Sequence, residues 1–106
     1  MSAKHLVVFI TTSGNEEARK ISREIVNNKL AACVNIVSNI HSVYLWKGGV
    51  EESSECLLIA KTLEEKFEKL INKVKEIHSY DVPEVIALPI VKGYEKYLRW
   101  IYDSLK

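Results

Sequence analysis

The chain has 106 residues, of which 47% are hydrophobic and 27% are charged, a composition typical of one globular domain and not of a disordered chain. We expect that single domain to extend over residues 1–106. Fifteen basic and fourteen acidic residues leave a formal net charge of +1, which excludes charge-driven binding to nucleic acid or to a membrane surface.

The first residues and the cysteines indicate the compartment. The stretch MSAKHLVVFITT has one lysine, a short apolar run and no small-residue cleavage pattern, so it predicts a first strand and not a signal peptide. The apolar runs of the sequence are too short to span a bilayer. Cys33 and Cys56 each lie in an apolar, strand-like run, which indicates reduced thiols rather than a disulfide framework. We therefore predict a cytoplasmic protein.

The first two predicted elements are a strand and a helix. Residues 5–12 (HLVVFITT) are β-branched and aromatic and precede a Ser-Gly pair, which predicts a buried central strand. Asn15 is expected to cap a helix through its side chain, with Glu16 and Glu17 at the positive end of the helix dipole. Apolar spacing predicts that the buried face of this helix comprises Ala18, Ile21, Ser22, Ile25 and Val26.

A long hairpin follows the helix. Residues 32–37 and 41–47 predict either two strands or one long strand with a bend or bulge between the two runs. A Gly-Gly pair at 48–49 supplies the turn, and residues 55–62 return antiparallel.

Two further helices and one strand complete the chain. The pattern Thr62-Leu63-Glu64-Glu65 predicts a capping box at the start of the second helix, which must end before Pro83. Residues 84–91 predict the fourth strand, and residues 94–106 predict a last helix. The inward face of that last helix is predicted to comprise Tyr94, Tyr97, Leu98, Ile101, Tyr102 and Leu105.

The predicted order of elements is β-α-β-β-α-β with an additional C-terminal helix. This order is typical of the α+β, ferredoxin-like sandwich, in which two helices cover one face of an antiparallel sheet. The strands at 41–47 and 55–62 are apolar on both sides, and two helices cannot cover both faces of the sheet. We therefore expect the last helix or other subunits to bury the second face.

His78 follows Ile71 and Val74 at helical spacing, on the apolar side of the second helix. One interpretation is a partly buried histidine near a helix C-terminus, and the other is a metal or ligand contact. The sequence places no nucleophile and no orienting partner beside it, so we predict that the protein is not an enzyme.

Four other polar residues have a structural interpretation beside a functional one. Asp81 fits a turn residue, and Glu84 is either a solvated strand start or an ion-pair partner of Lys61. Cys33 lies in an apolar run and is predicted to be a small core residue, with a soft-metal ligand as the alternative. The sequence contains no Cys-x-x-Cys, His-x-x-x-His or His-Glu-x-x-His pattern, so it predicts no dedicated zinc site.

Aromatic residues and loops distinguish between the functions that this fold supports. Tyr44, Trp46 and Trp100 lie at polar–apolar boundaries, where aromatic residues more often contact another subunit than a cofactor. The strand at 55–62 (ECLLIAKT) does not match the aromatic RNA-recognition pattern. The sequence also lacks the glycine-rich loop or loop arginine that a phosphate site needs.

Six blocks of the sequence form a distinctive set. They are LAACVNI (30–36), SVYLWKG (42–48), Glu52 with Glu55, AKT (60–62), HSYDVPEVIALPI (78–90) and YLRWI (97–101). In this order and spacing they resemble the CutA-type divalent-cation tolerance family, over nearly the whole chain. The resemblance implies a ferredoxin-like subunit that assembles into a compact homotrimer, in which strands continue sheets across subunits.

The resemblance also implies a role for a metal. Family members are associated with tolerance to copper and other divalent cations. Their proposed copper ligands are a cysteine near the end of the first strand and two histidines before the tyrosine of the HSYDVPE block. This chain has Thr11 and Thr12 at the strand end and Ile77 before His78. His78 is therefore the first candidate metal ligand, and Cys33 is the second.

The residues that match the family pattern are expected near a cleft between subunits; they are Tyr44, Trp46, Glu55, Lys61, Tyr80 and Glu84. The expected function is a non-enzymatic homotrimer in divalent-cation (copper) tolerance, with weak metal binding and no required cofactor. The alternative is a trimeric structural or signalling module that resembles the PII proteins, binds no physiological metal and contacts an unknown protein partner. Neither nucleic acid nor a membrane is an expected partner.

Overall fold

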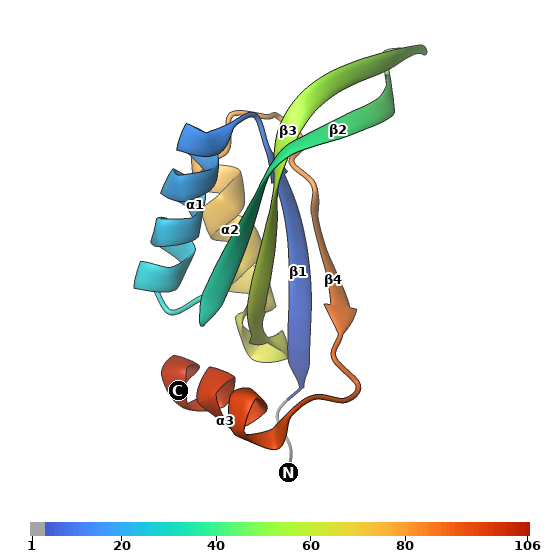
Figure 1. Cartoon of the computed structure of the whole chain (residues 1–106). Coiled ribbons are helices and arrows are strands. Elements are labelled where there is room, and N and C mark those ends of the chain that lie inside the picture. The colour runs from blue at the N-terminus through green and yellow to red at the C-terminus, as the bar shows by residue number, and fades with distance from the viewer. Residues whose placement is uncertain (1–3) are drawn as a thin grey trace.

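The structure is a computed structural model that describes residues 4–106, so residues 1–3 of the predicted domain lie outside the described part. Figure 1 shows a sheet with two helices on one face and a third helix across one end. None of the helices within residues 4–106 has the length and apolar character needed to cross a membrane. In chain order the elements are β1 (His5–Thr12), α1 (Asn15–Asn27), β2 (Cys33–Trp46), β3 (Gly49–Leu63), the 3-10 turn η1 (Glu64–Lys66), α2 (Phe67–Ile77), β4 (Val85–Pro89) and α3 (Glu95–Leu105).

The four strands form one antiparallel sheet in the order β2-β3-β1-β4. β1 is an inner strand: it pairs with β3 along its whole length and with β4 from Leu6 to Ile10. α1 connects β1 to β2 and α2 connects β3 to β4, and both helices lie on the same face of the sheet (Figure 1). This is the predicted ferredoxin-like α+β arrangement.

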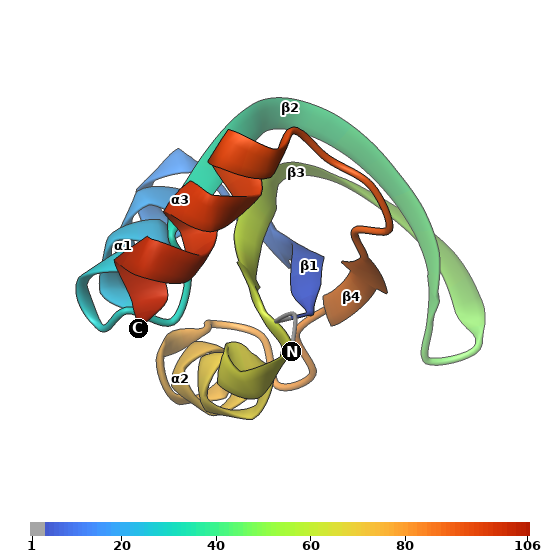
Figure 2. The same ribbon diagram turned by 90° about the horizontal axis from the view of Figure 1, so that it is seen from below.

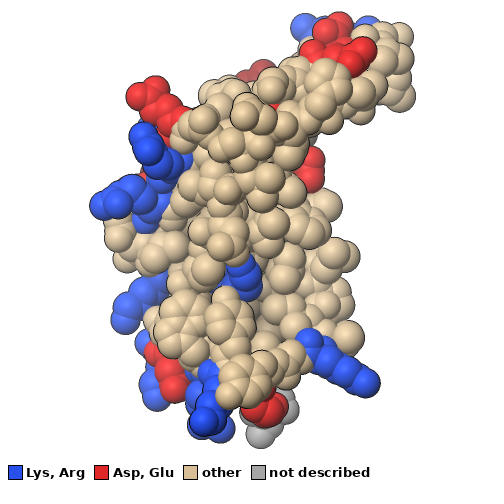
Figure 3. Space-filling model, viewed as in Figure 1, with Lys and Arg blue, Asp and Glu red and all other residues tan. Residues whose placement is uncertain are grey.

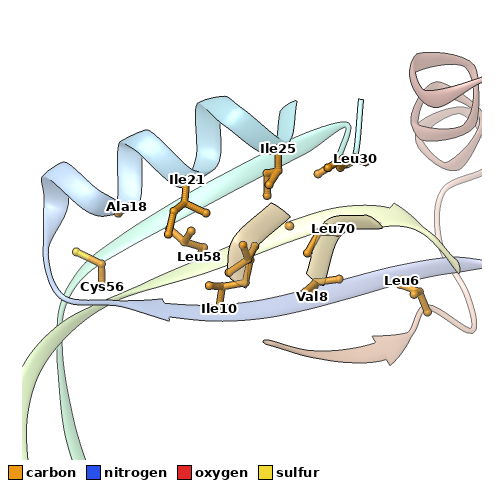
Figure 4. Close-up of a cluster of buried hydrophobic side chains, with 13 residues drawn as sticks. Leu6, Val8, Ile10, Ala18, Ile21, Ile25, Leu30, Cys56, Leu58 and Leu70 are labelled. Atoms are coloured by element: carbon orange, nitrogen blue, oxygen red, sulfur yellow. The ribbon is translucent and has the colours of Figure 1, made fainter. Parts of the chain in front are cut away.

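The core lies between the sheet and the helices α1 and α2 (Figure 4). Alternate residues of a strand point to opposite faces, so Val8 and Ile10 of β1 point to the helices together with Leu58 and Ala60 of β3. All four are fully buried. The predicted inner face of α1 is confirmed except at Val26, which is 39% exposed. The helices contribute the fully buried residues Ala18, Ile21, Ile25, Leu70 and Val74.

β2 is one strand of 14 residues with an irregularity, which decides between the two predicted alternatives. Its register with β3 shifts between Val37 and Ile40, and Asn39 has a φ of 60°. Asparagine tolerates this left-handed conformation better than most residues, and an extra residue in one strand bends the pair. Beyond this point the two strands bend away from the rest of the sheet (Figure 1, Figure 2).

The turn between β2 and β3 is displaced by one residue from the predicted Gly-Gly pair. Lys47 and Gly48 hold its two central positions, with φ values of 50° and 81°, and Trp46 pairs with Gly49. Two positive φ values in a two-residue loop are typical of a type I′ hairpin turn, whose twist matches that of the flanking strands. Glycine adopts this φ without steric strain, which explains its place in the turn.

Both predicted helix caps are wrong. Asn15 is the first residue of α1 rather than its cap, and its Oδ1 accepts a hydrogen bond from Ser38 Oγ at 2.7 Å. Thr62 still belongs to β3 and donates to the Leu30 carbonyl at 2.6 Å. The 3-10 turn η1 then precedes α2, without a side-chain cap. In both cases a tertiary hydrogen bond takes the side chain that the local pattern assigned to a helix end.

The C-terminal part is shorter and more exposed than predicted. β4 and α3 both fall short of the predicted ranges 84–91 and 94–106. Ile101 and Leu105 of α3 are buried against Leu63, because α3 lies across the end of the sheet rather than over its face. The inward prediction is wrong for three tyrosines: the exposed fractions are 71% for Tyr94, 40% for Tyr97 and 41% for Tyr102.

Residues 40–55 form a two-stranded extension, here called the hairpin arm, that continues beyond the end of β1 opposite Cys56. Leu45 and Val50 lie opposite each other on the arm and are 78% and 69% exposed. In Figure 3 most charged side chains lie along the helical side and at the tips, whereas the middle of this face has few. α3 therefore does not bury the second face of the sheet, and other subunits remain the expected cover.

Candidate functional site

A pocket of about 700 Å³ lies where the hairpin arm joins the sheet, facing the loop before β4. Tyr44 and Trp46 line it from β2, Glu55 lines it from β3, and Tyr80 and Glu84 line it from the loop. All but one of the residues predicted for the cleft thus come together, and their place between subunits stays a prediction. The other lining residues are Thr11, Ser13, Ser42, Val43, Ser53, Ser54, Asp81 and Val82.

Lys61 lies elsewhere, and the predicted ion pair between Lys61 and Glu84 does not form. Lys61 is opposite Val7 in the register of β1 and β3, whereas Glu84 accepts a hydrogen bond from Thr11 Oγ1 at 3.5 Å. Val7 and Thr11 are separated by about 13 Å along β1, given a rise of about 3.3 Å per residue. Lys61 Nζ lies instead 3.8 Å from Cys33 Sγ.

Tyr80 joins the two sides of the pocket. Its hydroxyl donates to Glu55 Oε2 at 2.6 Å, a short hydrogen bond to a charged acceptor. Burial and then the Glu55 carboxylate raise the pKa of Tyr80, so the phenol stays protonated and keeps donating. On the arm, Tyr44 Oη lies 3.3 Å from Ser53 Oγ.

His78 lies beside the pocket and its side chain is fully buried, more deeply than predicted. Nε2 donates to the Thr11 carbonyl at 2.8 Å, and Nδ1 accepts from the Tyr80 amide at 3.0 Å. A carbonyl only accepts and an amide N–H only donates, so these two bonds define a neutral imidazole with its proton on Nε2. Both ring nitrogens already have partners, and a metal ion on His78 would have to displace one of them.

Glu17 has a structural part that sequence reasoning missed. The sequence predicts it only as an acidic residue in the first helical turn. Its Oε1 accepts from the Ser13 amide at 3.0 Å and hydroxyl at 2.9 Å, and its Oε2 accepts from the Ser79 amide at 2.6 Å. Burial acts to raise the pKa of Glu17, but these hydrogen bonds outweigh it and lower the pKa from 4.5 to about 2. Glu17 thus fixes the loop that forms one pocket wall, and no local pattern signals a partner so distant in the chain.

Cys33 is half-buried at the start of β2, so its prediction as a core residue is wrong. Its Sγ lies beside Lys61 and 4.0 Å from Asn35 Oδ1, which Lys61 Nζ also contacts. Burial and then the neighbouring Cys33 raise the pKa of Tyr97. Cys33 is therefore part of a polar cluster on the face that the core helices do not cover.

The two candidate metal ligands do not come together. Cys33 pairs with Lys61 in the register of β2 and β3, whereas His78 binds the carbonyl of Thr11, which is opposite Leu57. Lys61 and Leu57 are separated by about 13 Å along β3. Within residues 4–106, no three or more His, Cys, Asp and Glu side chains are grouped so that they could hold a metal ion.

Several pocket residues carry no signal in the sequence. Ser42, Ser53 and Ser54 lie on the arm, where polar residues in a strand predict only a solvent-facing side. Asp81, predicted as a turn residue, adds a third carboxylate to the pocket. They become pocket residues because the arm and the loop meet.

Comparison with known proteins decides the family. A family model described as CutA1 divalent ion tolerance protein matches residues 6–104, which include the sheet, the core and the pocket. The chain belongs to the CutA1 divalent ion tolerance family. The resemblance that the sequence blocks indicate is thereby confirmed.

Individual CutA proteins agree with this membership. The divalent-cation tolerance protein CutA of Thermus thermophilus is 47% identical over 98 residues, 92% of this chain and 95% of that protein. The chloroplastic protein CutA of Arabidopsis thaliana is 50% identical over 101 residues, 95% of this chain, but this chain spans only 56% of its length. The crystal structure of CutA1 from Oryza sativa has a TM-score of 0.96 at 47% identity, covering 99% of this chain and 96% of that chain. The fold is thus that of the solved CutA1 proteins.

Proposed function

We propose that this CutA1 family member acts as a non-enzymatic homotrimer in divalent-cation tolerance and binds copper or another divalent cation weakly. Family membership supports the tolerance role, because a 47% identical relative carries the name divalent-cation tolerance protein. The proposal requires no cofactor. The observation that carries the assembly is the exposed hairpin arm.

The hairpin arm supports assembly of several copies. Val43, Leu45 and Val50 are 60%, 78% and 69% exposed, although they are large and apolar. A two-stranded ribbon is marginally stable by itself, and apolar side chains gathered on it usually mark a contact with another protein. A second copy on the arm would bury these side chains and cover the second face of the sheet. The number of three copies is what the family resemblance implies.

The pocket and His78 support weak rather than tight metal binding. Glu55, Asp81 and Glu84 are oxygen donors in one pocket, but Glu55 already accepts from Tyr80. His78 has hydrogen-bond partners on both ring nitrogens. A cation bound through these groups must replace an existing hydrogen bond, and that exchange reduces the affinity.

Sedimentation equilibrium tests the assembly directly. We expect one species with three times the 12.1 kDa mass of a single chain. A monomer at micromolar concentration would contradict the trimer, because the arm would then be stable without a partner.

Calorimetric titration with copper tests the metal contact. We expect weak binding to the native protein, weaker binding to His78→Ala, and unchanged binding to His41→Ala, whose exposed ring pairs with Glu52 on the arm. Circular dichroism checks that each variant is folded. Equal affinities of the three proteins would remove His78 from the metal site.

One observation favours a second candidate function. Both nitrogens of His78 are hydrogen-bonded, and residues 4–106 contain no grouping of three ligand side chains. A trimer without a physiological metal, acting as a structural or signalling module like the PII proteins, is consistent with this geometry. An intact trimer that takes up no copper in the titration would support this candidate, whereas saturable copper binding would reject it.

We propose the cytoplasm as the location. Cys33 and Cys56 are free thiols, as expected in a reducing compartment. Relatives differ in this respect, since the Arabidopsis protein is named chloroplastic and the Archaeoglobus fulgidus structure is described as periplasmic. Cell fractionation of the tagged protein is the direct test.

A further inference from the structure

The pocket at the base of the hairpin arm combines acidic and aromatic walls. Glu55, Asp81 and Glu84 bring three carboxylates. Tyr44 and Trp46 bring two large rings, and the described lining residues include no Lys, Arg or His. We propose that this pocket binds a small organic cation with an ammonium group next to an aromatic body, such as an arylalkylamine. This binding requires no metal and is independent of the tolerance function.

The size of the pocket fits an organic molecule better than a bare ion. Its volume of about 700 Å³ lies in the range of roughly 300–1,000 Å³ that is usual for small-molecule sites. A bare divalent ion needs several ligand atoms that converge on one point. Such a convergent group of three is absent from residues 4–106. The carboxylates are thus spread along the walls, where they can contact separate parts of a larger cation.

The charge of the pocket selects for cations. Glu55 accepts a hydrogen bond from Tyr80 at 2.6 Å, whereas Glu84 accepts only a long one of 3.5 Å from Thr11. A carboxylate has about four acceptor sites, so Glu84 keeps the capacity to accept from an ammonium group. The cation expected from the sequence, Lys61, contacts Cys33 instead and leaves the pocket without a basic partner. Uncompensated negative charge in a concave site raises the local concentration of cations.

The aromatic walls suit the body of such a ligand. Tyr44 and Trp46 are 42% and 50% exposed, so their rings are accessible from the pocket. An aromatic face attracts a cation within about 6 Å of its centroid. Lys47 Nζ lies 5.9 Å from the Trp46 ring centroid, so the chain already holds one ammonium group over this ring. A ligand between Glu84 and the rings would have a charge partner and an apolar surface together.

Calorimetric titration of the assembled full chain with phenethylamine tests the proposal. Two matched probes separate its parts: 2-phenylethanol has the same ring without the charge, and phenylacetate has the opposite charge. We expect phenethylamine to bind about tenfold more tightly than the alcohol, a ratio that corresponds to one charge-assisted contact. We expect no measurable binding of phenylacetate, because three carboxylates repel it.

Variants place the binding in the pocket. Glu84→Gln keeps the shape of the side chain and removes its charge, and Trp46→Ala removes one ring; each should weaken phenethylamine binding about tenfold. Glu51→Gln lies on the arm outside the pocket and should leave the affinity unchanged. Circular dichroism and sedimentation check that each variant folds and assembles like the native protein.

Three results would overturn the proposal. Equal affinities for the amine and the alcohol would show an apolar hollow without selection for charge. An amine affinity that neither Glu84→Gln nor Trp46→Ala changes would place the binding elsewhere. No binding of any probe, as expected if a neighbouring copy fills the pocket, would reject the site. The copper titration and the mass of the assembly are read separately, so this failure is distinguishable from a failure of the tolerance proposal.

Discussion

Tyr80 donates a hydrogen bond of 2.6 Å to Glu55, and this bond joins the loop before β4 to the base of the hairpin arm. The same loop is held from behind. His78 accepts from the Tyr80 amide, and Glu17 accepts from the Ser79 amide. One wall of the pocket is therefore positioned by contacts with α1, β1 and β3 at once.

Removing the Tyr80 hydroxyl should destabilise the protein. Tyr80→Phe keeps the ring but leaves Glu55 without its donor, so we expect the free energy of unfolding to fall by about 1 kcal/mol. Urea denaturation at a fixed chain concentration measures this change. Tyr44→Phe is the matched control, because its hydroxyl makes an exposed contact of 3.3 Å with Ser53, and it should change stability by less than about 0.5 kcal/mol. Equal losses in the two variants would contradict the role of Tyr80.

Glu17 should make stability depend on pH in the acid range. Its pKa is lowered from 4.5 to about 2, which means that the folded state favours the ionised carboxylate. The stabilisation is therefore fully present above about pH 4.5 and is lost as the pH falls towards 2. Glu17→Gln should lower the free energy of unfolding by about 2 kcal/mol at pH 7, because hydrogen bonds to a charged acceptor are replaced by bonds to a neutral one.

Thermal unfolding at several pH values measures the Glu17 effect. The difference in melting temperature between the native protein and Glu17→Gln should shrink between pH 4.5 and 2, where the native carboxyl becomes protonated. Glu16→Gln, an exposed neighbour in the same helical turn, serves as the control and should show a small difference at every pH. A Glu17→Gln difference that stays constant down to pH 2 would disprove the linkage.

Thr62 should stabilise the fold through its hydroxyl. Thr62→Val keeps the shape of the side chain but removes the donor to the Leu30 carbonyl, which lies in the buried end of the sheet. We expect a loss of about 1–2 kcal/mol in the free energy of unfolding. Ser104→Ala, which removes an exposed hydroxyl bound to the Trp100 carbonyl, should cost less than about 0.5 kcal/mol in the same urea experiment. A stability of Thr62→Val equal to the native value would show that the buried carbonyl finds another donor.

A charge on the hairpin arm should break the assembly. Leu45→Glu places a carboxylate in a position that the proposed trimer buries, so we expect sedimentation equilibrium to show a shift from trimer to monomer at micromolar concentration. Lys20→Gln changes the net charge by the same amount on the exposed side of α1 and should remain assembled. If Leu45→Glu stays trimeric, the arm does not form the interface.

Much of the fold is predictable because hydrophobic periodicity is a local property. The inner face of α1 at Ile21 and Ile25 follows from spacing alone, and so does the alternation of Val8 and Ile10 in β1. The irregular strand β2 is also predictable in part, because Asn39 interrupts two apolar runs. The family resemblance adds the pocket residues as a set, although it does not state their contacts.

The wrong predictions concern side chains whose partners lie far away in the sequence. Asn15 fits a helix cap, yet Ser38 and Cys56 donate to it. Lys61 and Glu84 have opposite charges and fit an ion pair, yet the sheet register separates them. A local pattern cannot reveal such competition, because a hydrogen bond goes to whichever partner the packed chain brings within about 3 Å.

The sequence by itself determined the order of the elements, the core-facing residues of β1 and α1, and the membership of the CutA1 family. The tertiary structure alone decided the contacts. It placed His78 in two hydrogen bonds that occupy its ring nitrogens, moved Lys61 away from the acidic pocket and made Glu17 the anchor of the loop before β4. The physical reason is that periodicity sets which face of an element is apolar, whereas the register of the sheet sets which distant side chains meet.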